Sequence, residues 1–411
     1  MMTIYGKYTN AIVYADILDD KTKEQIKVLI DQDFMKDVKV RIMADCHAGA
    51  GCVIGTTLEI KNKIVPNLVG VDIGCGMLCV NLEKTQIDFE GLDNFIHNSI
   101  PAGMNVNKDI TKSNVVLEDL KCINEINKIT YLKKSLGSLG GGNHFIEIDV
   151  NSKGEYYLVI HTGSRNLGKQ VAEIYQNKAI QYHENKLFNK KEALNKVITE
   201  YKQTGRQKEI QAEIQRISQM YIQLSMPKEL CYLEGSDFND YMYDMDMCQK
   251  FATENRIEIA RRITNYLGLN IDELDKFETI HNYISMNDKI LRKGSISAYE
   301  NEIVLIPMNM RDGCIIAKGK SNSDYNYSAP HGAGRVMSRG DAFRTLTIDD
   351  FKKSMDGIYT TTANETTLDE SPFVYKPMES ILNNIKDTVD VLEIIKPVYN
   401  FKASDKKFHA L

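Results

Sequence analysis

The stretch KIVPNLVGVDIGCGMLCVNL, residues 63–82, decides what kind of fold this chain adopts. Short apolar runs stand on either side of a glycine-rich turn that contains Asp72 and Cys75. Apolar runs of this length, bounded by turn residues, predict buried strands. The segments GGNHFIEIDV (141–150) and YYLVIHTGSR (156–165) repeat the pattern, and each carries a histidine. The sequence therefore predicts layered β-sheets in which polar side chains lie in or at the ends of apolar strands.

Helical segments alternate with these strands. Residues 170–226 are charged and contain one turn signal, QTGRQ, which predicts two helices folded back as a hairpin. A further helix is expected from Ser236, a favoured N-cap residue, to Gly268, a favoured stop. Its Met and Tyr side chains recur at helical spacing, which is typical of core positions.

The C-terminal part is predicted to return to strands, with residues 281–310 mostly β and residues 378–403 a helix, a strand and a tail. No internal repeat or low-complexity linker divides the chain. We therefore expect an α+β fold: a single large compact unit of layered β-sheets with flanking helices over residues 1–411, in which residues 183–226 are an inserted helical hairpin.

Composition narrows the class of protein. The chain has 411 residues and a hydrophobic fraction of 43%, and no apolar run approaches the roughly 20 residues that a membrane span needs. We expect a soluble, cytoplasmic protein. The eight cysteines are sparse and form no C-x-x-C pair, which argues against a disulfide scaffold or a zinc ribbon. The net charge of −5 argues against a broad nucleic-acid surface but leaves room for one basic groove.

Several residues with metal-binding side chains stand in glycine- or asparagine-containing turns: Asp72, Cys75, His144, His161 and His281. A lone histidine in a strand is usually a core or surface residue, and a lone buried cysteine is usually a small hydrophobe. Clustering favours a metal site instead. Five donors are too many for one tetrahedral ion, so two ions that share the Cys75 thiolate are the economical arrangement. Paired ions are typical of phosphoryl and nucleotidyl transfer.

The stretch SAPHGAGRVMSR, residues 328–339, places a sixth candidate, His331, directly before a Gly-Ala-Gly turn. Backbone N–H groups in such a turn can close on a phosphate, and Arg335 or Arg339 can add charge-assisted bonds. An imidazole beside a bound phosphate can act as general acid, metal ligand or nucleophile. The spacing alone does not choose among these three roles.

Taken together, the motifs resemble the RtcB family of GTP-dependent RNA ligases. Nine of them occur in order along nearly the whole chain: DCHAGAG at Asp45, VGVDIGCGM around Asp72, SLGGGNHFIEI around Gly141, VIHTGSRNLG around His161, IHNY at His281, RKGSISA at Arg292, HGAGRVMSR at His331, SPFVYKP around Tyr375 and YNFKA around Lys402.

The resemblance implies an RNA ligase that joins 3′-phosphate or 2′,3′-cyclic phosphate ends to 5′-hydroxyl ends, in RNA repair or tRNA splicing. It implies a guanylyl–histidine intermediate formed with GTP and Mn²⁺. Three alternatives stay open: a guanylyltransferase that caps 3′-phosphate ends without sealing them, a metal-dependent phosphoesterase, and a binding module with a vestigial site. The expected partners are RNA and GTP, an activating protein is left open, no membrane is involved, and the chain is expected to be a monomer.

Carried over by motif, the resemblance makes His331 the nucleophile and Cys75 the bridge between two Mn²⁺ ions, with Asp72 and His144 on one side and His161 and His281 on the other. The residues implied at the nucleotide are Asn143, His144, Phe145, Ile146, Glu147, His281, Asn282, Pro307, Met308, Asn309, Met310, Cys314, His331, Gly332, Ala333, Gly334, Tyr375 and Lys402, and those implied at the RNA are Asp45, Arg165, Arg335 and Arg339.

This chain departs from the family pattern in three places. Residues 307–310 read Pro-Met-Asn-Met where Pro-Gly-Ser-Met is usual, and Cys314 stands in place of a serine. The DCHAGAG turn is the second departure, with Ala44 and Cys46 where proline and an aliphatic residue are usual. The helical hairpin is the third departure. Its basic side chains grip RNA backbone in one interpretation and form a solvated face with interleaved Glu in the other: Lys186, Lys190, Lys191, Lys196, Lys202, Arg206, Lys208 and Arg216. We hypothesise that the hairpin adapts the enzyme to a particular RNA.

Overall fold

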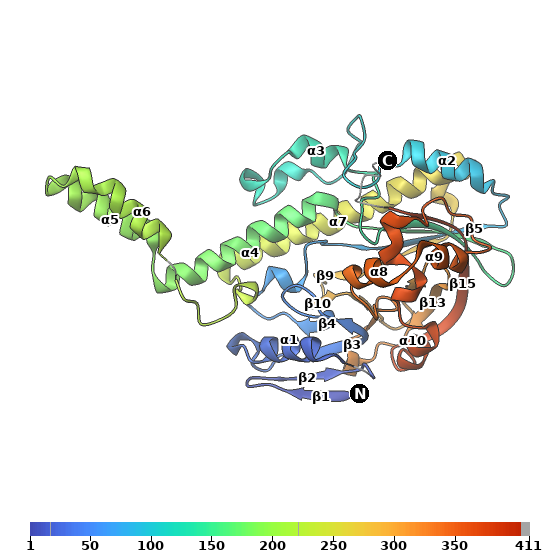
Figure 1. Cartoon of the computed structure of the whole chain (residues 1–411), viewed down its shortest axis with the longest axis horizontal. Coiled ribbons are helices and arrows are strands. Elements are labelled where there is room, and N and C mark those ends of the chain that lie inside the picture. The colour runs from blue at the N-terminus through green and yellow to red at the C-terminus, as the bar shows by residue number, and fades with distance from the viewer. Residues whose placement is uncertain (17, 221, 404–411) are drawn as a thin grey trace.

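The computed structural model describes residues 1–16, 18–220 and 222–403, and these form the predicted α+β unit (Figure 1). Within these ranges the strands make a six-stranded, a seven-stranded and a two-stranded sheet. The predicted tail beyond Ala403 lies outside the described residues. None of the helices in the described ranges combines the length and apolarity needed to cross a bilayer.

The six-stranded sheet contains the N-terminal strands. Its strands pair in the order β1, β2, β3, β4, β10, β9, antiparallel except for β2 with β3. Helix α1 (Asp20–Ile30) connects that parallel pair, since parallel neighbours need a crossover connection. Asp19 caps the helix by accepting a hydrogen bond from the Thr22 N–H. The strand bounds are β1 Met2–Tyr5, β2 Asn10–Val13, β3 Val40–His47, β4 Ile54–Glu59, β9 Asn282–Ile284 and β10 Ile290–Lys293.

The seven-stranded sheet is antiparallel throughout and has the order β12, β13, β15, β6, β7, β5, β8. Its two edge strands approach each other, because the Leu305 N–H of β12 donates a 3.0 Å hydrogen bond to Thr279 Oγ1 of β8. The sheet is therefore curled, with an inner and an outer face. Its strands are β5 Gly76–Glu83, β6 Phe145–Val150, β7 Tyr156–Thr162, β8 Lys276–Ile280, β12 Ile303–Asn309, β13 Gly313–Gly319 and β15 Val389–Lys402.

Alternate residues of the curled sheet enter two different cores. Ile146 and Ile148 of β6 point outward and pack against helices α2 (Phe89–Ser99) and α7 (Gly235–Tyr266). Phe145, together with Val159 and Cys314, points inward. Because both faces are covered, most positions along these strands are buried, which explains the nearly continuous apolar runs in the sequence.

The remaining strands and helices complete the described part of the fold. β11 (Ser295–Ser297) pairs with β14 (Ser328–Pro330), and the predicted mostly-β segment 281–310 is confirmed as β9 to β12. The predicted helix and strand near the C-terminus are confirmed as α10 (Met378–Asn384) and β15. The other helices are α3 Ile129–Lys134, α8 Arg339–Thr345 and α9 Ile348–Ser354.

Helix α7 confirms the predicted core helix but not its N-cap. The residue at the cap is Glu234, which makes no side-chain capping bond, and Ser236 lies inside the first turn. At the other end the helix stops as predicted, with Gly268 at φ 76° in the left-handed region that favours glycine. The predicted Met and Tyr core positions, Tyr241 and Met245 among them, are buried.

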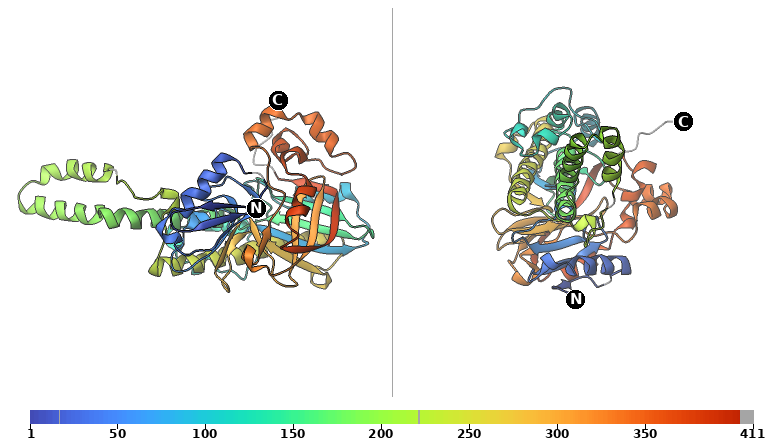
Figure 2. Two further views of the ribbon diagram at one scale, coloured as in Figure 1. Left: turned by 90° about the horizontal axis from the view of Figure 1, so that it is seen from below. Right: turned by 90° about the vertical axis from the view of Figure 1, so that its left-hand side faces the viewer.

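Residues 165–219 contain three helices where the sequence predicted two. Helix α4 (Arg165–Leu187) runs past His183, and the chain breaks at Asn189, whose side chain caps α5 (Lys190–Gln203). Asparagine favours such breaks because its side chain satisfies a free N–H of the next helix. α5 and α6 (Ile210–Gln219) project away from the body of the molecule (Figures 1 and 2). In α5 and α6, Ile217 alone is buried, so this arm, residues 190–219, is a surface element.

Candidate active site

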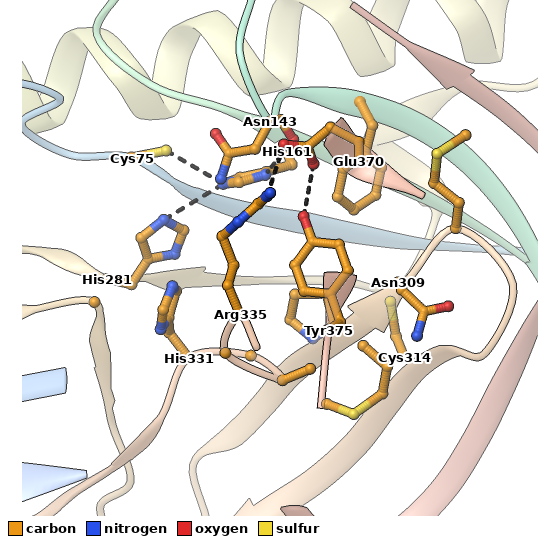
Figure 3. A pocket seen from close by; sticks show the side chains of 18 of the residues that line it. Cys75, Asn143, His161, His281, Asn309, Cys314, His331, Arg335, Glu370 and Tyr375 are labelled. Atoms are coloured by element: carbon orange, nitrogen blue, oxygen red, sulfur yellow. Dashed lines mark hydrogen bonds and ion pairs between the residues drawn. The ribbon is translucent and has the colours of Figure 1, made fainter. Parts of the chain in front are cut away.

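A cavity of about 330 Å³ lies where the ends of β5, β7 and β8 meet the loop that follows β14 (Figure 3). Most of the predicted site residues line it: Asp72, Cys75, Asn143, Phe145, Glu147, His161, His281, Asn282, Pro307, Met308, Asn309, Met310, Cys314, His331, Gly332, Ala333, Gly334, Arg335, Arg339, Tyr375 and Lys402. Sequence reasoning missed further lining residues: His47, Ile54, Gly294, Gly313, Glu370 and Asn400.

Strand pairing brings the candidate metal ligands to one edge of the curled sheet. Cys75 directly precedes β5, whose Met77 pairs with His161 of β7. Phe145 of β6 also pairs with His161, so His144 arrives beside it. The His281 N–H, just beyond β8, donates to the Cys75 carbonyl at 3.0 Å. Because neighbouring strands are antiparallel, the start of one strand lies beside the end of the next. The start of β5 and β6 and the end of β7 and β8 therefore bring the four ligands together.

Two groups of donor atoms share the Cys75 thiol. One group contains Asp72, Cys75 and His144, and the other contains Cys75, His161 and His281; within each, the donor atoms lie within 4.8 Å of one another. Cys75 Sγ is 3.6 Å from His144 Nε2 and 3.3 Å from His161 Nε2. His144 Nε2 is 3.0 Å from Asp72 Oδ2, and the Nε2 atoms of His161 and His281 are 3.4 Å apart.

The hydrogen bonds behind these rings determine which nitrogen faces the group. His144 Nδ1 lies 2.9 Å from the Leu139 carbonyl and His161 Nδ1 lies 3.2 Å from the Asn143 carbonyl. A carbonyl only accepts, so each Nδ1 carries the proton and each Nε2 directs a lone pair inward. Lone pairs that converge on a thiol repel one another unless a cation lies between them. The donor set therefore fits bound metal ions.

The electrostatics of the buried groups agree with this reading. Burial lowers the pKa values of His161 and His281 well below their ordinary range, which keeps both imidazoles neutral. Burial opposes ionisation of Asp72, but its neighbours, His144 first among them, outweigh it and lower the pKa of that carboxyl. Burial raises the pKa of the Cys75 thiol, a cost that a bound cation offsets by favouring the thiolate.

His331 lies next to the second of these groups, with its ring centroid 4.9 Å from that of His281 (Figure 3). Its Nδ1 lies 2.7 Å from Oδ2 of Asp45, a fully buried residue of β3. The same oxygen accepts the backbone N–H groups of His331 at 3.1 Å and Gly332 at 3.2 Å. A carboxylate beside Nδ1 holds the proton there and leaves the Nε2 lone pair free.

The Gly-Ala-Gly turn differs in one respect from the predicted phosphate cradle. The Gly332 N–H is bonded to Asp45, so it helps to fix the histidine. Position 334 requires glycine for two reasons. Its φ is 74°, and a Cβ there would lie 2.6 Å from the Asp45 carbonyl oxygen. The turn thus packs directly on the residue that orients His331, and Asp45 lies behind the histidine and not at the cavity wall.

Cationic side chains gather around the buried Glu370 at the far wall. Lys402 Nζ lies 2.9 Å from Glu370 Oε2 and donates to the Asn143 carbonyl at 3.0 Å. Arg335 and Arg339 approach the other oxygen at 3.4 and 3.3 Å, and the Tyr375 hydroxyl donates to Glu370 at 2.7 Å. Burial opposes ionisation of Glu370, but these cations outweigh it and lower its pKa. Both arginines predicted to contact RNA phosphate therefore bind a carboxylate of this chain.

Besides Asp45, three predicted site residues lie outside the cavity lining. Arg165 donates to Ser138 Oγ at 3.1 Å and to the Gly103 carbonyl at 2.7 Å. His144 lies behind Asp72 and is buried. Ile146 was expected at the nucleotide, but its side chain points to the outer face of β6 because strand residues alternate, and it packs in the core against α2 and α7.

Two buried residues of α7, which the sequence did not single out, support the ligand loops. Asn255 accepts the Gly137 and Ser138 N–H groups and donates to the Gly163 carbonyl at 3.2 Å. The Arg256 guanidinium is fully buried, pairs with Glu278 at 2.6 Å, and donates to the Gly74 and Thr162 carbonyls at 2.8 and 2.6 Å. Gly74 and Thr162 adjoin Cys75 and His161, so this helix sets the ligand spacing.

Two donor groups that share a thiol, beside an oriented histidine, form the kind of site that metal-dependent phosphoryl- and nucleotidyl-transfer enzymes use. The family model described as tRNA-splicing ligase RtcB matches residues 33–130 and 119–403. The chain therefore belongs to the RtcB family, and the resemblance drawn from its motifs is confirmed.

Relatives with curated names agree over most of their length. The chain is 26% identical to the RNA-splicing ligase RtcB of Escherichia coli K12, over 87% of this chain and 88% of that protein. It is 26% identical to the tRNA-splicing ligase RtcB of Aeropyrum pernix over 90% of each chain. It is 25% identical to the tRNA-splicing ligase RtcB of Nanoarchaeum equitans over 83% of each.

Proposed function

We propose that this chain is an RNA ligase that joins 3′-phosphate or 2′,3′-cyclic phosphate ends to 5′-hydroxyl ends, with GTP and two Mn²⁺ ions, through a guanylyl–histidine intermediate at His331. The observation that carries this proposal is the Asp45–His331 pair, 2.7 Å apart, because its histidine lines a cavity beside two thiol-sharing donor groups. Family membership and the names of the relatives support the same assignment.

The metal ions would be held by Asp72, Cys75 and His144 on one side and by Cys75, His161 and His281 on the other. Bound there, they would neutralise negative charge on phosphate groups. This ligand set also suits zinc and cobalt, so Mn²⁺ is proposed from the family and not from the donor chemistry. The chain's own contribution is the spacing, which Arg256 and Asn255 set from α7.

In the first step, the Nε2 lone pair of His331 forms a bond to the α-phosphorus of GTP, and pyrophosphate leaves with the electrons of the broken P–O bond. The ring gains positive charge as that bond forms, and the Asp45 carboxylate beside the Nδ1 proton stabilises it. A 2′,3′-cyclic end is first hydrolysed by water to a 3′-phosphate and a free 2′-hydroxyl. GMP then passes to the RNA 3′-phosphate, and the imidazole leaves as the neutral Nδ1–H tautomer that Asp45 holds. Finally the 5′-hydroxyl oxygen attacks the activated phosphate, gives its proton to water, and displaces GMP.

The opposite end of the cavity would take the nucleoside. Glu147, Cys314, Asn400 and Lys402 lie there on neighbouring strands of the curled sheet. Met308 and Met310 are buried and line the same cavity, so the unusual Pro-Met-Asn-Met segment supplies apolar surface to its wall. Arg335 and Arg339 would reach RNA phosphates only by exchanging Glu370 and Asp369 for them.

The first test is adduct formation with GTP labelled at the α-phosphate in the presence of Mn²⁺. We expect acid-labile label on the wild-type chain and on His97→Ala, a control whose half-exposed histidine lies outside the cavity lining, but none on His331→Ala. RNA with both end types then separates the alternatives. A sealed product indicates a ligase, a stable GMP-bearing end indicates a capping guanylyltransferase, and loss of phosphate without an adduct indicates a phosphoesterase.

A further inference from the structure

A second buried polar cluster lies directly behind the nucleoside end of the cavity. Phe145, Glu147 and Asp149 are every second residue of β6 and share its inner face. Phe145 and Glu147 line the cavity, whereas Asp149 lies beyond Glu147 and has no exposed surface. Donor atoms of Glu147, Asp149 and Cys314 lie within 4.8 Å of one another. The cluster is thus continuous with the cavity floor but closed to solvent.

The cluster contains two carboxyl groups, and no cation among the described residues is bonded to either of them. Glu147 accepts a hydrogen bond from Asn400 Nδ2, and its other oxygen lies 4.0 Å from Cys314 Sγ. Within the described residues, no donor group bonds to either oxygen of Asp149, so only a proton on Asp149 itself can link it to Glu147. The nearest amine, Lys402, is already engaged with Glu370 and a backbone carbonyl.

The other strands packed around the pair present neutral groups. β7 places Val159 opposite Glu147 and Tyr157 opposite Asp149, and β5 adds Cys79. Burial raises the pKa values of the Cys79 and Cys314 thiols well above their usual range, and burial raises that of Tyr157 to about 12, so all three stay protonated.

Two carboxyl groups in such surroundings cannot both be ionised, because burial and mutual repulsion act in the same direction. The pair therefore keeps one proton. Burial, followed by the charge of Glu147, raises the pKa of Asp149 well above its ordinary value, whereas burial raises that of Glu147 to about 7. Asn400 donates to Glu147 and favours its ionised form, whereas no donor group reaches Asp149 within the described residues. Asp149 is therefore the member that retains the proton, and Glu147 faces the cavity as an acceptor.

A hydrogen-bond acceptor at the floor of the cavity can distinguish guanine from adenine, because the two bases present different donors and acceptors along the edge that contains N1. Guanine presents two adjacent N–H donors, N1–H and the 2-amino group, which match the two oxygens of a carboxylate. Adenine presents an unprotonated N1, whose lone pair would face those oxygens. A protonated Glu147 would lose this preference, since its hydroxyl would suit an acceptor nitrogen.

We propose that Asp149 is a positioning residue for nucleobase selectivity: it holds the single proton of the Glu147–Asp149 pair and so keeps Glu147 as the acceptor for paired N–H donors. This inference rests on the proposed nucleotidyl transfer. It assigns a role to a residue that does not touch the nucleotide and that no motif singled out.

The test compares adduct formation from α-labelled GTP and ATP between pH 6 and 8.5. In the wild type, the ratio of GTP to ATP efficiency should be about tenfold lower at pH 6 than at pH 8.5, with the change centred on the Glu147 pKa of about 7. Asp149→Asn keeps a donor beside Glu147, so its ratio at pH 7.5 should stay within about threefold of wild type. Asp149→Leu removes the donor, so Glu147 takes the proton and the ratio should drop at least about tenfold.

Glu393→Gln is the matched control, because it removes a carboxylate from the same sheet that bonds Asn151 and does not line the cavity. The proposal is overturned if the Asn and Leu variants give equal ratios, if the wild-type ratio does not change with pH, or if Asp149→Asn loses a metal ion that Glu393→Gln keeps. The wild-type pH profile needs no variant and decides the matter even if Asp149→Leu does not fold.

A failure of the proposed function looks different. If the wild type forms no adduct with either nucleotide, the nucleotidyl transfer is wrong. Calorimetric binding of GTP and ATP to the Mn²⁺-loaded chain at the same pH values then still tests the selectivity assigned to Asp149, since binding requires no reaction at His331. Preference for GTP that weakens below about pH 7 would support it, and equal affinities would refute it.

Discussion

Replacing Asp45 by asparagine tests how the structure activates His331. The Asp45 carboxylate accepts three N–H groups on one oxygen, from the His331 ring at 2.7 Å and from the His331 and Gly332 backbone at 3.1 and 3.2 Å. Asparagine has nearly the same shape and can accept the same three bonds through its amide oxygen. The variant therefore removes the charge and little else.

The expected loss follows from that charge. A hydrogen bond to a charged group contributes about 1.5–3 kcal/mol, against about 0.5–1.5 kcal/mol for a neutral one. The difference of about 1–2 kcal/mol corresponds to a rate about 5–30-fold lower, at about 1.4 kcal/mol per tenfold. A flipped amide would instead donate to Nδ1 and put the proton on Nε2, which costs up to about 10⁴-fold in a comparable histidine–aspartate pair. The two backbone donors oppose that flip, because they would then face an NH₂ group.

The assay is single-turnover adduct formation at saturating α-labelled GTP and Mn²⁺. Asp93→Asn is the control, because Asp93 is another buried carboxylate that accepts from Tyr399 and Thr361 away from the cavity. We expect a 5–30-fold lower rate for Asp45→Asn, as estimated above, and no change for Asp93→Asn. A rate within twofold of wild type would refute the electrostatic role of Asp45, and a loss beyond about a thousandfold would refute the argument that the backbone donors hold the amide.

Three further predictions concern the metal end and the arm. Cys75→Ala should lose both metal ions, measured by elemental analysis, and adduct formation with them, while thermal unfolding changes little; a variant that still forms adduct at the normal rate would show that the thiol does not bridge. Arg256→Leu removes the ion pair of Glu278 and the hydrogen bonds to two loop carbonyls. Denaturant titration should show a free energy of unfolding lower by about 3–5 kcal/mol, and metal titration should show a weaker affinity. An unchanged metal affinity would contradict the role given to α7. Replacing residues 190–219 by a short linker should slow ligation of a structured RNA more than that of a short unstructured one, and equal rates on both would rule out the arm as an RNA-adapting element.

Local sequence patterns predicted the parts of the site that strand pairing assembles. Cys75, His144, His161 and His281 adjoin the apolar runs of neighbouring strands, so the recognition of strands with polar ends already implied that these side chains meet. The register that aligns them is dictated by burial on both faces, because a shift of one residue would exchange the inner and outer core positions.

Contacts between distant segments were beyond sequence reasoning. Asp45 and His331 are 286 positions apart, and only the packing of the loop after β14 against β3 makes them a pair. Arg256 stands among charged residues of a long helix, where an exposed ion pair is the ordinary expectation. A signal did exist, since position 256 falls on the same helical stripe as the buried Ala252, Ile259 and Ile263. The break at Asn189 was missed because a helix pattern with charged residues on all sides shows no change of periodicity there.

The two ends of the cavity depend on different features of the β-strands. The metal ligands lie at or just beyond strand ends, where Arg256 of α7 bonds the adjacent backbone carbonyls and backbone carbonyls bond the ligand rings. The nucleoside end lies inside the curled sheet, where alternation compels Phe145, Glu147 and Asp149 to share one face. Pairing of Phe145 with both His161 and Lys402 fixes that register, so an acid at position 149 cannot avoid burial.

Burying a carboxyl group without a partner costs several kcal/mol, and an apolar residue would avoid that cost at this position. A chain that keeps an acid there gains something other than stability, and the adjacent acceptor at the cavity floor, Glu147, is the group that benefits.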